Sequence, residues 1–429
     1  MTATVFDDRD RDLLLRLLAL PTAGPLETGP QGPRPQLWTV QRQYARAAAD
    51  LGFRTEYHGC ATPSDLTREG VPLVVRESAS QPDFLATQPS LVLRLGPRLP
   101  ADSTVMFNVH LDTVAGIEEV GFDGSRFTGR GAIDAKGQAV ALLVGVRAAL
   151  ARAPRLGRDV GVVIQAVSGE EGGAMGTFGT RRLIEAGHYG RLNVFCEPTG
   201  LRYLTRATAA MTARVRVVGE DAVDDRPGAG HNATVLLGFL AQHFARLPDQ
   251  ERDGSLCVAG LHTGDLHNRV YGSGHLLMNL AYPSAAAGRR LERLVTDAFH
   301  EGLAEFATAF AGTREFGRTA AEAATVTTLD WPKRGLPCLD GKDAELEALL
   351  AGAGLTRWPA HEPAFTCDAI WMNGLPGAFT VVLGAGALDG NHAHAAGEYA
   401  DLADLRAFAD AVASILTGFA ARTTWEATS

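Results

Sequence analysis

The sequence predicts an α/β protein whose mostly parallel sheet carries helices on both faces and is interrupted by a smaller α+β domain. Three observations lead to this prediction. Apolar strand-like segments alternate with helical segments over most of the chain. Polar clusters follow several of these strands, as they do at the carboxyl edge of parallel sheets. Between residues 205 and 324 the pattern changes to that of an antiparallel sheet with two helices.

The elements of the larger domain alternate along the chain in the order expected for a parallel sheet. Helical periodicity marks residues 13–20 and the segment "LWTVQRQYARAAADLGF", in which Gly52 ends the helix. Strands are then expected at 90–95, 104–112, 159–169 and 192–198, and helices at 137–153 and 177–187. The Pro- and Gly-rich residues 22–35 are expected to form a surface loop that borders the site.

The smaller domain begins with "RATAAMTARVRVVGE", which alternates like a half-exposed strand. A helix at 232–244, strands through 274–282 and a helix at 289–310 complete a ferredoxin-like β-α-β-β-α-β order. The first pattern resumes near Trp331 and ends with a helix from Asp401 onward. We therefore expect one domain from residues 1–204 and 325–429, with the insert at 205–324.

Composition excludes several classes of function. The chain has 40 basic and 49 acidic residues, a formal charge of -9 and no basic block, which argues against nucleic acid and anionic membranes as partners. Its five cysteines are scattered without a CxxC pair, so neither a disulfide framework nor a thiolate zinc site is indicated. Charges within the amino-terminal apolar run predict an amphipathic helix and not a signal peptide. A cytoplasmic location is expected.

Five polar clusters carry the chemistry. They are "HLD" at 110–112, "GRGAIDAKG" at 129–137, "SGEEGG" at 168–173, "FCEPTG" at 195–200 and "GNHAHAAGEY" at 390–399. His110 and Asp112 share one face of a strand, as a catalytic pair, a metal ligand with its orienting carboxylate or a polar strand end would. Two histidines and three carboxylates that converge would suit Zn²⁺, and a bridging carboxylate can hold two ions.

The adjacent Glu170 and Glu171 are the most informative pair. Neighbouring carboxylates in an apolar loop repel one another unless a cation compensates them or one holds a proton. Glu171 can then bind metal while Glu170 accepts a proton from the attacking water. A solvated loop at this pair, a helix cap at Asp134, a turn at Glu197 and a surface His394 are the alternatives. The ordered occurrence of all these groups at strand ends favours the metal site.

The segments "HLDTV", "GRGAIDAKGQ", "SGEEGG", "EPTG" and "HAAGEY" together resemble the motif series of the M20 metallopeptidase family. That family includes acetylornithine deacetylase, succinyl-diaminopimelate desuccinylase, aminoacylase and glutamate carboxypeptidase. The resemblance spans nearly the whole chain. It implies a zinc-peptidase-like catalytic domain, interrupted by a lid that commonly makes the contact of a homodimer. It also implies two Zn²⁺ ions per chain, with Co²⁺ or Mn²⁺ as substitutes.

The resemblance also assigns roles to residues. It implies the metal ligands, with Asp134 as the bridge, His110 and Glu197 at one ion, and Glu171 and His394 at the other. It further implies that Asp112 holds the ring of His110, that Glu170 is the general base and that the peptide bond after Asp134 is cis. The "HxxGEY" spacing selects His394 over His392. Asp368 matches an aspartate of the family, and helix capping is the alternative role for it.

The lid departs from the family pattern. Val223 stands where relatives place a histidine that steadies the oxyanion, and His231, His262 or His267 are the candidates to replace it. We expect His231 to be a solvent-facing residue at the start of a helix. Asn268 fits a family asparagine, but Asn279 and Ala281 replace an Asp-x-Arg pair whose arginine commonly binds a substrate carboxylate. Asn268 and Arg269 are therefore the candidates for substrate binding.

The expected function is that of a zinc-dependent amidohydrolase that releases the amino group of an N-acyl amino acid or related small molecule. Glu rather than Asp at position 197 resembles the acyl-amino-acid and carboxypeptidase branches. A dipeptidase or carboxypeptidase with the same metals is the first alternative. A catalytically weak binding module on the same fold is the second, motivated by Val223 and Ala281.

Overall fold

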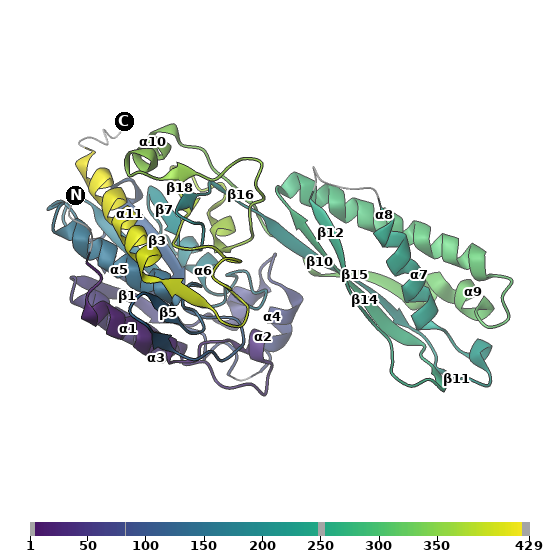
Figure 1. Cartoon of the computed structure of the whole chain (residues 1–429). Coiled ribbons are helices and arrows are strands. Elements are labelled where there is room, and N and C mark those ends of the chain that lie inside the picture. The colour runs from purple at the N-terminus through teal and green to yellow at the C-terminus, as the bar shows by residue number, and fades with distance from the viewer. Residues whose placement is uncertain (1–4, 82, 248–253, 423–429) are drawn as a thin grey trace. The chain divides into compact units, whose positions relative to one another are not determined.

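The computed structural model describes residues 5–81, 83–247 and 254–422. Contacts between Cα atoms divide the chain into two compact units. The first unit contains the chain up to Ala207 and again from Leu339 onward, and the second contains Thr208–Cys338. Figure 1 labels their helices and strands.

A six-stranded sheet forms the centre of the first unit. In spatial order its strands are β1 (Phe53–Gly59), β2 (Ser90–Leu95), β6 (Gly161–Val167), β3 (Thr104–His110), β7 (Leu192–Phe195) and β18 (Phe379–Val382). The neighbours β6, β3, β7 and β18 run parallel to one another, whereas β2 is antiparallel to both β6 and β1. The sheet is therefore mostly parallel, and the predicted fold class is confirmed.

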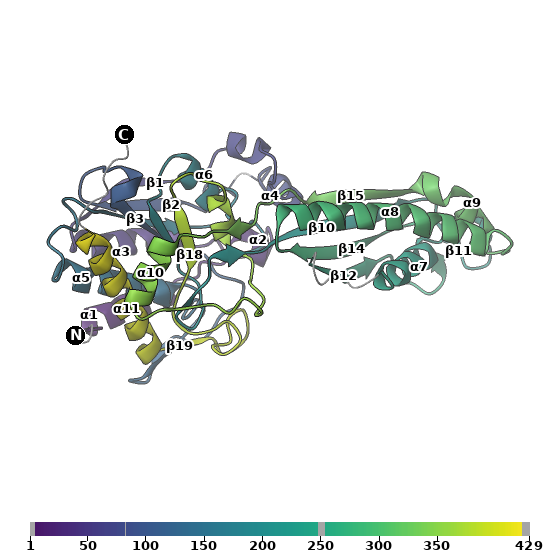
Figure 2. The same ribbon diagram turned by 90° about the horizontal axis from the view of Figure 1, so that it is seen from above.

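Helices cover both faces of this sheet. Val105, Phe107 and Val109 of β3 belong to the main apolar core, together with residues of α1, α3, α5 and α11. Asn108 points to the other face because successive strand residues alternate, and its side chain donates to the Thr180 hydroxyl at the start of α6, at 3.1 Å. Figure 2 shows α5 and α11 on one side of the strands and α6 on the other.

The helices of the first unit are α1 (Asp8–Leu18), α2 (Pro25–Thr28), α3 (Leu37–Ala49), α4 (Leu73–Ser78), α5 (Lys136–Leu150), α6 (Thr180–Glu185), α10 (Ala344–Gly352) and α11 (Leu402–Ala421). Short strands form three further sheets: β4 (Gly121–Phe122) with β5 (Arg126–Thr128) and β19 (Tyr399–Asp401), β8 (Arg202–Tyr203) with β17 (Thr356–Arg357), and β9 (Arg206–Ala207) with β16 (Leu339–Asp340). Single 3₁₀ turns are η1 (Pro63–Thr67), η2 (Ala101–Ser103) and η4 (Asp368–Met372). The expected loop at residues 22–35 is a loop except for α2.

The second unit is built on a four-stranded antiparallel sheet in the order β12, β14, β10, β15. Its elements are β10 (Ala209–Val218), β11 (Ala222–Val223), η3 (Pro227–Ala229), α7 (Ala233–Ala245), β12 (Ser255–His262), β13 (Arg269–Val270), β14 (Ser273–Tyr282), α8 (Ala285–Phe310), α9 (Gly317–Val326) and β15 (Thr327–Lys333). Ala213, Val215 and Val217 of β10 are buried, whereas Arg216 and Val218 are exposed. Helices α7 and α8 pack on this sheet and on each other.

The second boundary differs from the predicted one at residues 324 and 325. Strand β15 pairs with β10 through Thr327, Leu329 and Asp330, so the insert continues to Cys338. Trp331 is consequently a residue of the insert and does not begin the returning α/β pattern. Sequence alternation could not assign this strand because a half-exposed strand has the same periodicity in either sheet.

Among the residues that the structure describes, no helix has both the length and the apolar character needed to cross a membrane.

Candidate metal centre

The strand order brings the polar clusters of the first unit together. The neighbours β6, β3 and β7 are parallel, so their carboxyl ends meet at one edge of the sheet. His110 is the last residue of β3, the glutamate pair follows β6, and Glu197 follows β7. Asp134 lies in the loop that leads into α5, and its peptide bond to Ala135 is cis.

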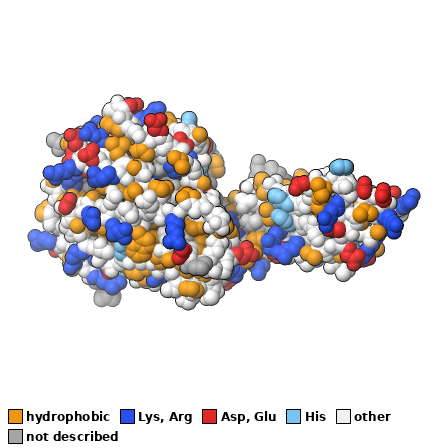
Figure 3. Space-filling view, turned by 90° about the horizontal axis from the view of Figure 1, so that it is seen from below, with side chains coloured by type: hydrophobic (Ala, Val, Ile, Leu, Met, Phe, Trp, Pro, Cys, Tyr) orange, Lys and Arg blue, Asp and Glu red, His pale blue; other side chains and the backbone are white. Residues whose placement is uncertain are grey.

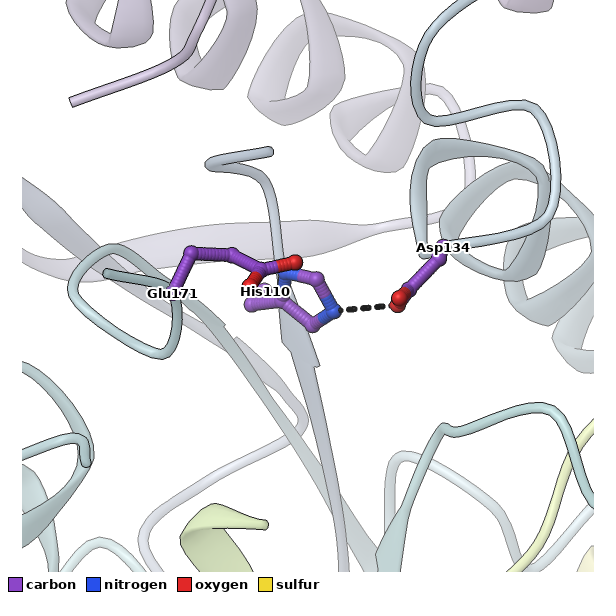
Figure 4. A group of neighbouring side chains, drawn as sticks. All are labelled: His110, Asp134 and Glu171. Carbon is purple, nitrogen blue, oxygen red and sulfur yellow. Dashed lines mark hydrogen bonds and ion pairs between the residues drawn. The ribbon is translucent and has the colours of Figure 1, made fainter. Parts of the chain in front are cut away.

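Asp134 lies between two imidazoles. Its Oδ1 is 2.8 Å from Nε2 of His110, and its Oδ2 is 2.9 Å from Nε2 of His394. Each carboxylate oxygen thus faces a different histidine. His110, Asp134 and Glu171 have ligand atoms that all lie within 4.8 Å of one another, and Figure 4 shows the three side chains converging from separate segments.

The two remaining glutamates complete the cluster. Oε1 of Glu171 is 3.1 Å from Nε2 of His394, and Oε2 of Glu197 is 3.9 Å from Nε2 of His110. Both glutamates are buried, whereas 51% of the His394 side chain is exposed. The structure therefore places His110 beside Glu197 and His394 beside Glu171, with Asp134 in contact with both histidines.

Asp112 has a different contact from the one that the family resemblance implies. Nδ1 of His110 donates to the backbone carbonyl oxygen of Asp112 at 3.0 Å, while the Asp112 carboxylate is 3.9 Å away. Oδ2 of that carboxylate instead accepts hydrogen bonds from the backbone N–H groups of Gly169 and Glu171, at 3.0 and 3.1 Å. The carboxylate thus holds the loop that carries the glutamate pair, and the backbone orients His110.

Residue 169 must be glycine for this loop to close. Gly169 has a φ of +80°, and a Cβ atom there would lie 2.3 Å from the ring of Phe178. The backbone of the loop therefore approaches the core more closely than any side chain allows.

The pKa values in the cluster show an excess of negative charge. Burial and the neighbouring Glu171 and Glu197 raise the pKa of Glu170 well above its usual range. Burial likewise raises the pKa values of Glu171 and Glu197. Hydrogen bonds to Asp134 and Glu171 raise the pKa of His394 to about 10. Burial would lower the pKa of His110, but Asp134 and the other carboxylates raise it well above its usual value.

This donor set fits divalent cations. Buried carboxylates are costly unless positive charge compensates them, and the two imidazoles do so only when both are protonated. Imidazole nitrogens with carboxylate oxygens are the ligands of Zn²⁺ sites and also suit Co²⁺ and Mn²⁺. Asp134 has one carboxylate oxygen facing each imidazole. The side chains present therefore match a two-metal site in number and in chemistry.

Asp368 also belongs to this region, and helix capping is not its role. It is the first residue of η4, and Cys367 precedes it without a side-chain capping bond. The Asp368 carboxylate is buried, and its Oδ2 accepts a hydrogen bond from the Thr180 hydroxyl. Burial raises its pKa to about 7. Thr180 was not singled out in the sequence, because only its position at the start of α6 brings it to this carboxylate.

His392 does not join the cluster. Its ring lies 5.8 Å from that of Tyr399 in a T-shaped contact. His392 and His394 both have left-handed backbone conformations, with φ of 55° and 63°. The "HxxGEY" spacing therefore selects the histidine that reaches Asp134.

The residues of the second unit that were considered for substrate binding or for the missing lid histidine lie at its surface, with one exception. Asn268 is exposed, and Arg269 forms an ion pair with Asp221. Val223 is 57% exposed in β11. His231 is buried, so its expected position at the solvent-facing start of a helix was wrong.

The contacts of His231 explain its burial. Its Nδ1 accepts the backbone N–H of Glu220 at 2.9 Å, and its Nε2 is 3.1 Å from a carboxylate oxygen of Glu322. The ring thus joins the segment after β10 to α9. The other two candidates for the missing lid histidine, His262 and His267, are exposed, and His262 stacks on His275 with ring centroids 4.7 Å apart.

Comparison with known proteins identifies the family. The profile of peptidase family M20/M25/M40 matches residues 106–418, which include every candidate metal ligand. The chain belongs to this family. Membership places the M20 protein described here among enzymes that hydrolyse amide bonds.

Solved structures share its fold. Aminopeptidase PepT of Bacillus cereus is similar with a TM-score of 0.65 and 15% identity, over 96% of this chain and 98% of that one. An M20 family metallo-carboxypeptidase of Sulfolobus solfataricus is similar with a TM-score of 0.67 and 11% identity, over 96% and 100% of the two chains. These two likenesses concern the fold alone.

A curated relative matches part of the sequence. A protein of Aeropyrum pernix described as a LysW-lysine/LysW-ornithine hydrolase is 28% identical over 174 residues. The match covers 40% of this chain and 46% of the relative, so the chain spans less than half of that relative's length.

Proposed function

We propose that this M20 protein is a two-metal amidohydrolase that releases the amino group of an N-acyl amino acid or related small molecule. The observation that carries the proposal is the position of Asp134, whose two carboxylate oxygens face His110 and His394 separately. A carboxylate between two sets of nitrogen and oxygen ligands is the arrangement expected of a bridging ligand.

In this proposal, five side chains hold the ions. His110 and Glu197 would hold one ion, Glu171 and His394 would hold the other, and Asp134 would be a ligand of both. When bound, a pair of divalent ions polarises the amide carbonyl and lowers the pKa of water, so that water attacks near neutral pH. Zn²⁺ fits the donor set best, and Co²⁺ or Mn²⁺ can replace it.

Glu170 moves the proton in this reaction. Its carboxylate takes the proton released by the attacking water and transfers it to the leaving nitrogen. Burial and two neighbouring glutamates raise its pKa, which suits proton transfer near neutral pH. Asp112 supports this step indirectly, because it binds the backbone on both sides of Glu170.

The proposed substrate class is an N-acyl amino acid or related small molecule. The curated relative is named for LysW-lysine and LysW-ornithine, and each of these names joins LysW to an amino acid, which supports an amino acid as the amine released here. Glu197 in place of aspartate resembles both the acyl-amino-acid and the carboxypeptidase branches, so this residue does not separate the two candidates. A dipeptidase or carboxypeptidase with the same metal ligands is the second candidate, and the metallo-carboxypeptidase of Sulfolobus solfataricus is an example of a carboxypeptidase with this fold.

Substrate binding by the second unit is part of the same proposal. Arg269 is engaged by Asp221 in this structure, so a substrate carboxylate would have to compete with that ion pair for the guanidinium group. Asn268 is exposed and its amide is open to a ligand.

We further propose a cytoplasmic homodimer through the second unit. Strand β12 lies at an edge of its sheet, and the backbone groups of an edge strand are suited to pairing with a second chain. Sedimentation at micromolar concentration tests this assembly, and a monomer under those conditions contradicts it.

The decisive experiment measures metal content and amine release together. Purified protein is assayed with N-acetyl amino acids, N-succinyl amino acids and dipeptides, and Glu170→Ala is the catalytic control. About two ions per chain and activity that the substitution abolishes would support the mechanism, and the preferred substrate would separate the two candidates. Absence of bound metal after zinc is supplied would contradict the proposal and favour a binding module.

A further inference from the structure

Glu398 is a buried carboxylate whose two oxygens are both saturated by donors. Only 1% of the residue is exposed. Its Oε1 accepts the backbone N–H groups of Ile133 and Asp134, at 3.1 and 3.2 Å. Its Oε2 accepts the backbone N–H of Gly131 at 3.0 Å and Nη1 of Arg130 at 2.8 Å. A single side chain therefore holds the backbone from residue 131 to residue 134.

This contact connects two of the candidate ligand segments. Glu398 follows His394 by four residues in the same loop, and the backbone that it binds ends at Asp134. Glu398 thus constrains the position of Asp134 relative to His394, in addition to the direct hydrogen bond between these two side chains. Rigid support of this kind orients ligands that would otherwise move with their loops.

Arg130 extends the connection to a third segment. Its Nη2 donates to the backbone oxygen of Ala395 at 3.0 Å and to Oε1 of Glu118 at 3.4 Å. Oε2 of Glu118 in turn accepts the backbone N–H of Gly397 at 3.0 Å. The segments that follow His110, precede Asp134 and follow His394 are therefore joined in one hydrogen-bonded network, which is buried at Arg130 and Glu398 and exposed at Gly397.

We propose that Glu398 is a positioning residue that fixes the distance between Asp134 and His394 and thereby the geometry of the bridging ligand. This inference rests on the proposed two-metal function but concerns a residue to which that function assigns no role. Glu398 acts through the backbone that carries Asp134, because its carboxylate accepts the N–H groups of Gly131, Ile133 and Asp134.

The contacts predict an unusual response to substitution. Because both oxygens accept from N–H donors, an amide in either orientation would place its NH₂ group against a donor. Glu398→Gln should therefore be nearly as damaging as Glu398→Ala, although it is almost isosteric. Glu398→Asp keeps two acceptor oxygens on a shorter side chain and should recover part of the loss.

The test compares these variants with Glu119→Gln, the same chemical change at an exposed glutamate beside Glu118. Zinc affinity is measured by chelator competition, and the geometry of the site by the visible spectrum of the Co²⁺ form. For Glu398→Gln we expect zinc affinity to fall by about 10- to 100-fold, as it does when other residues that hold a metal ligand in place are lost, with a changed Co²⁺ spectrum. The turnover number should fall while KM changes little.

A metal-independent measurement keeps the inference testable if the variant is unstable or if no metal binds. Amide exchange of residues 129–136 in the metal-free wild type should be slow and should become fast in Glu398→Gln and in Arg130→Met. A purely structural role would lower stability without altering the Co²⁺ spectrum of the folded fraction. Spectrum, zinc affinity and exchange all within twofold of Glu119→Gln would overturn the inference. Failure of the wild type to bind metal would instead contradict the proposed function.

Discussion

Asp134 and His394 lie 260 residues apart in the sequence, yet Oδ2 of Asp134 accepts a hydrogen bond from Nε2 of His394 at 2.9 Å. The two groups are also those that the proposal assigns to one metal ion. A proton shared along this hydrogen bond and a metal ion therefore compete for the same atoms.

Metal binding should release protons and strengthen with pH. The hydrogen bonds to Asp134 and Glu171 raise the pKa of His394 to about 10, so the metal-free imidazole is protonated at neutral pH. A metal ion binds only the neutral ring, and the apparent affinity should rise about tenfold per pH unit for each proton displaced, until the pKa is passed. Calorimetric titration in two buffers of different ionisation enthalpy measures the protons released. Release of no protons at pH 7 contradicts this assignment.

The same shift affects the stability of the metal-free protein. Because the folded pKa of His394 is raised, its contribution is fully present below the unfolded pKa of about 6.5 and is lost as pH rises through about 10. The His394 side chain is half exposed, which makes this contribution modest. Metal-free protein should therefore lose some stability between these pH values, as urea unfolding would show. His394→Ala should remove that part of the pH dependence.

Replacing Glu170 should separate catalysis from metal binding. Glu170→Gln removes the proton acceptor and leaves all five candidate ligands in place. We expect the turnover number to fall by about 10²- to 10⁴-fold with metal content unchanged. Metal content and steady-state kinetic constants are measured for the variant and for the wild type. If the variant loses metal in proportion to activity, Glu170 is a ligand and not the base.

The sequence could place the metal centre because its motifs stand at strand ends. His110, Glu171 and Glu197 follow three neighbouring strands, so the topology of the sheet alone brings them together. The contacts of Asp112 and Thr180 could not be found in this way. They depend on the orientation of a carbonyl group and on where a short helix begins, and neither leaves a periodic signal in the sequence.

The insert shows the same limit. The order of its strands and helices could be predicted from the sequence. The burial of His231, however, depends on α9, whose Glu322 contacts the imidazole. The extent of the insert likewise depends on which sheet β15 joins. Both are tertiary relationships between segments about 90 to 120 residues apart, beyond the reach of a local pattern.

Asp112 provides a test of the backbone contact described above. Its carboxylate accepts two hydrogen bonds, from the backbone N–H groups of Gly169 and Glu171, and both are accepted by Oδ2. Asp112→Asn can keep both bonds, and its amide NH₂ then takes the place of Oδ1, which has no hydrogen-bond partner among the described residues. We expect Asp112→Asn to change metal affinity by less than about tenfold and Asp112→Ala by more. Equal, large losses in both variants would show that the carboxylate charge acts on His110 directly.

The packing of α5 against α11 should contribute to the stability of the protein. Helix α5 begins two residues after Asp134, and it contacts α11 closely at Gly145. A Cβ atom at Gly145 would lie 2.6 Å from both the backbone oxygen of Ala409 and Cβ of Val412, neither of which can give way without moving α11. Gly145→Ala should therefore destabilise the protein by about 1–3 kcal/mol despite the higher helix propensity of alanine.

Gly418 in α11 is the matched control, because a Cβ atom there would meet only Leu349, at 3.7 Å. Gly418→Ala should stabilise the protein by about 0.5–1 kcal/mol, and urea unfolding of the metal-free protein measures both variants. Since α5 follows Asp134 and α11 follows the His394 loop, a larger separation of these helices should also weaken zinc binding in Gly145→Ala but not in Gly418→Ala. Equal zinc affinity in the two variants would show that the ligand loops are held independently of the helices behind them, leaving the network of Arg130 and Glu398 as their support.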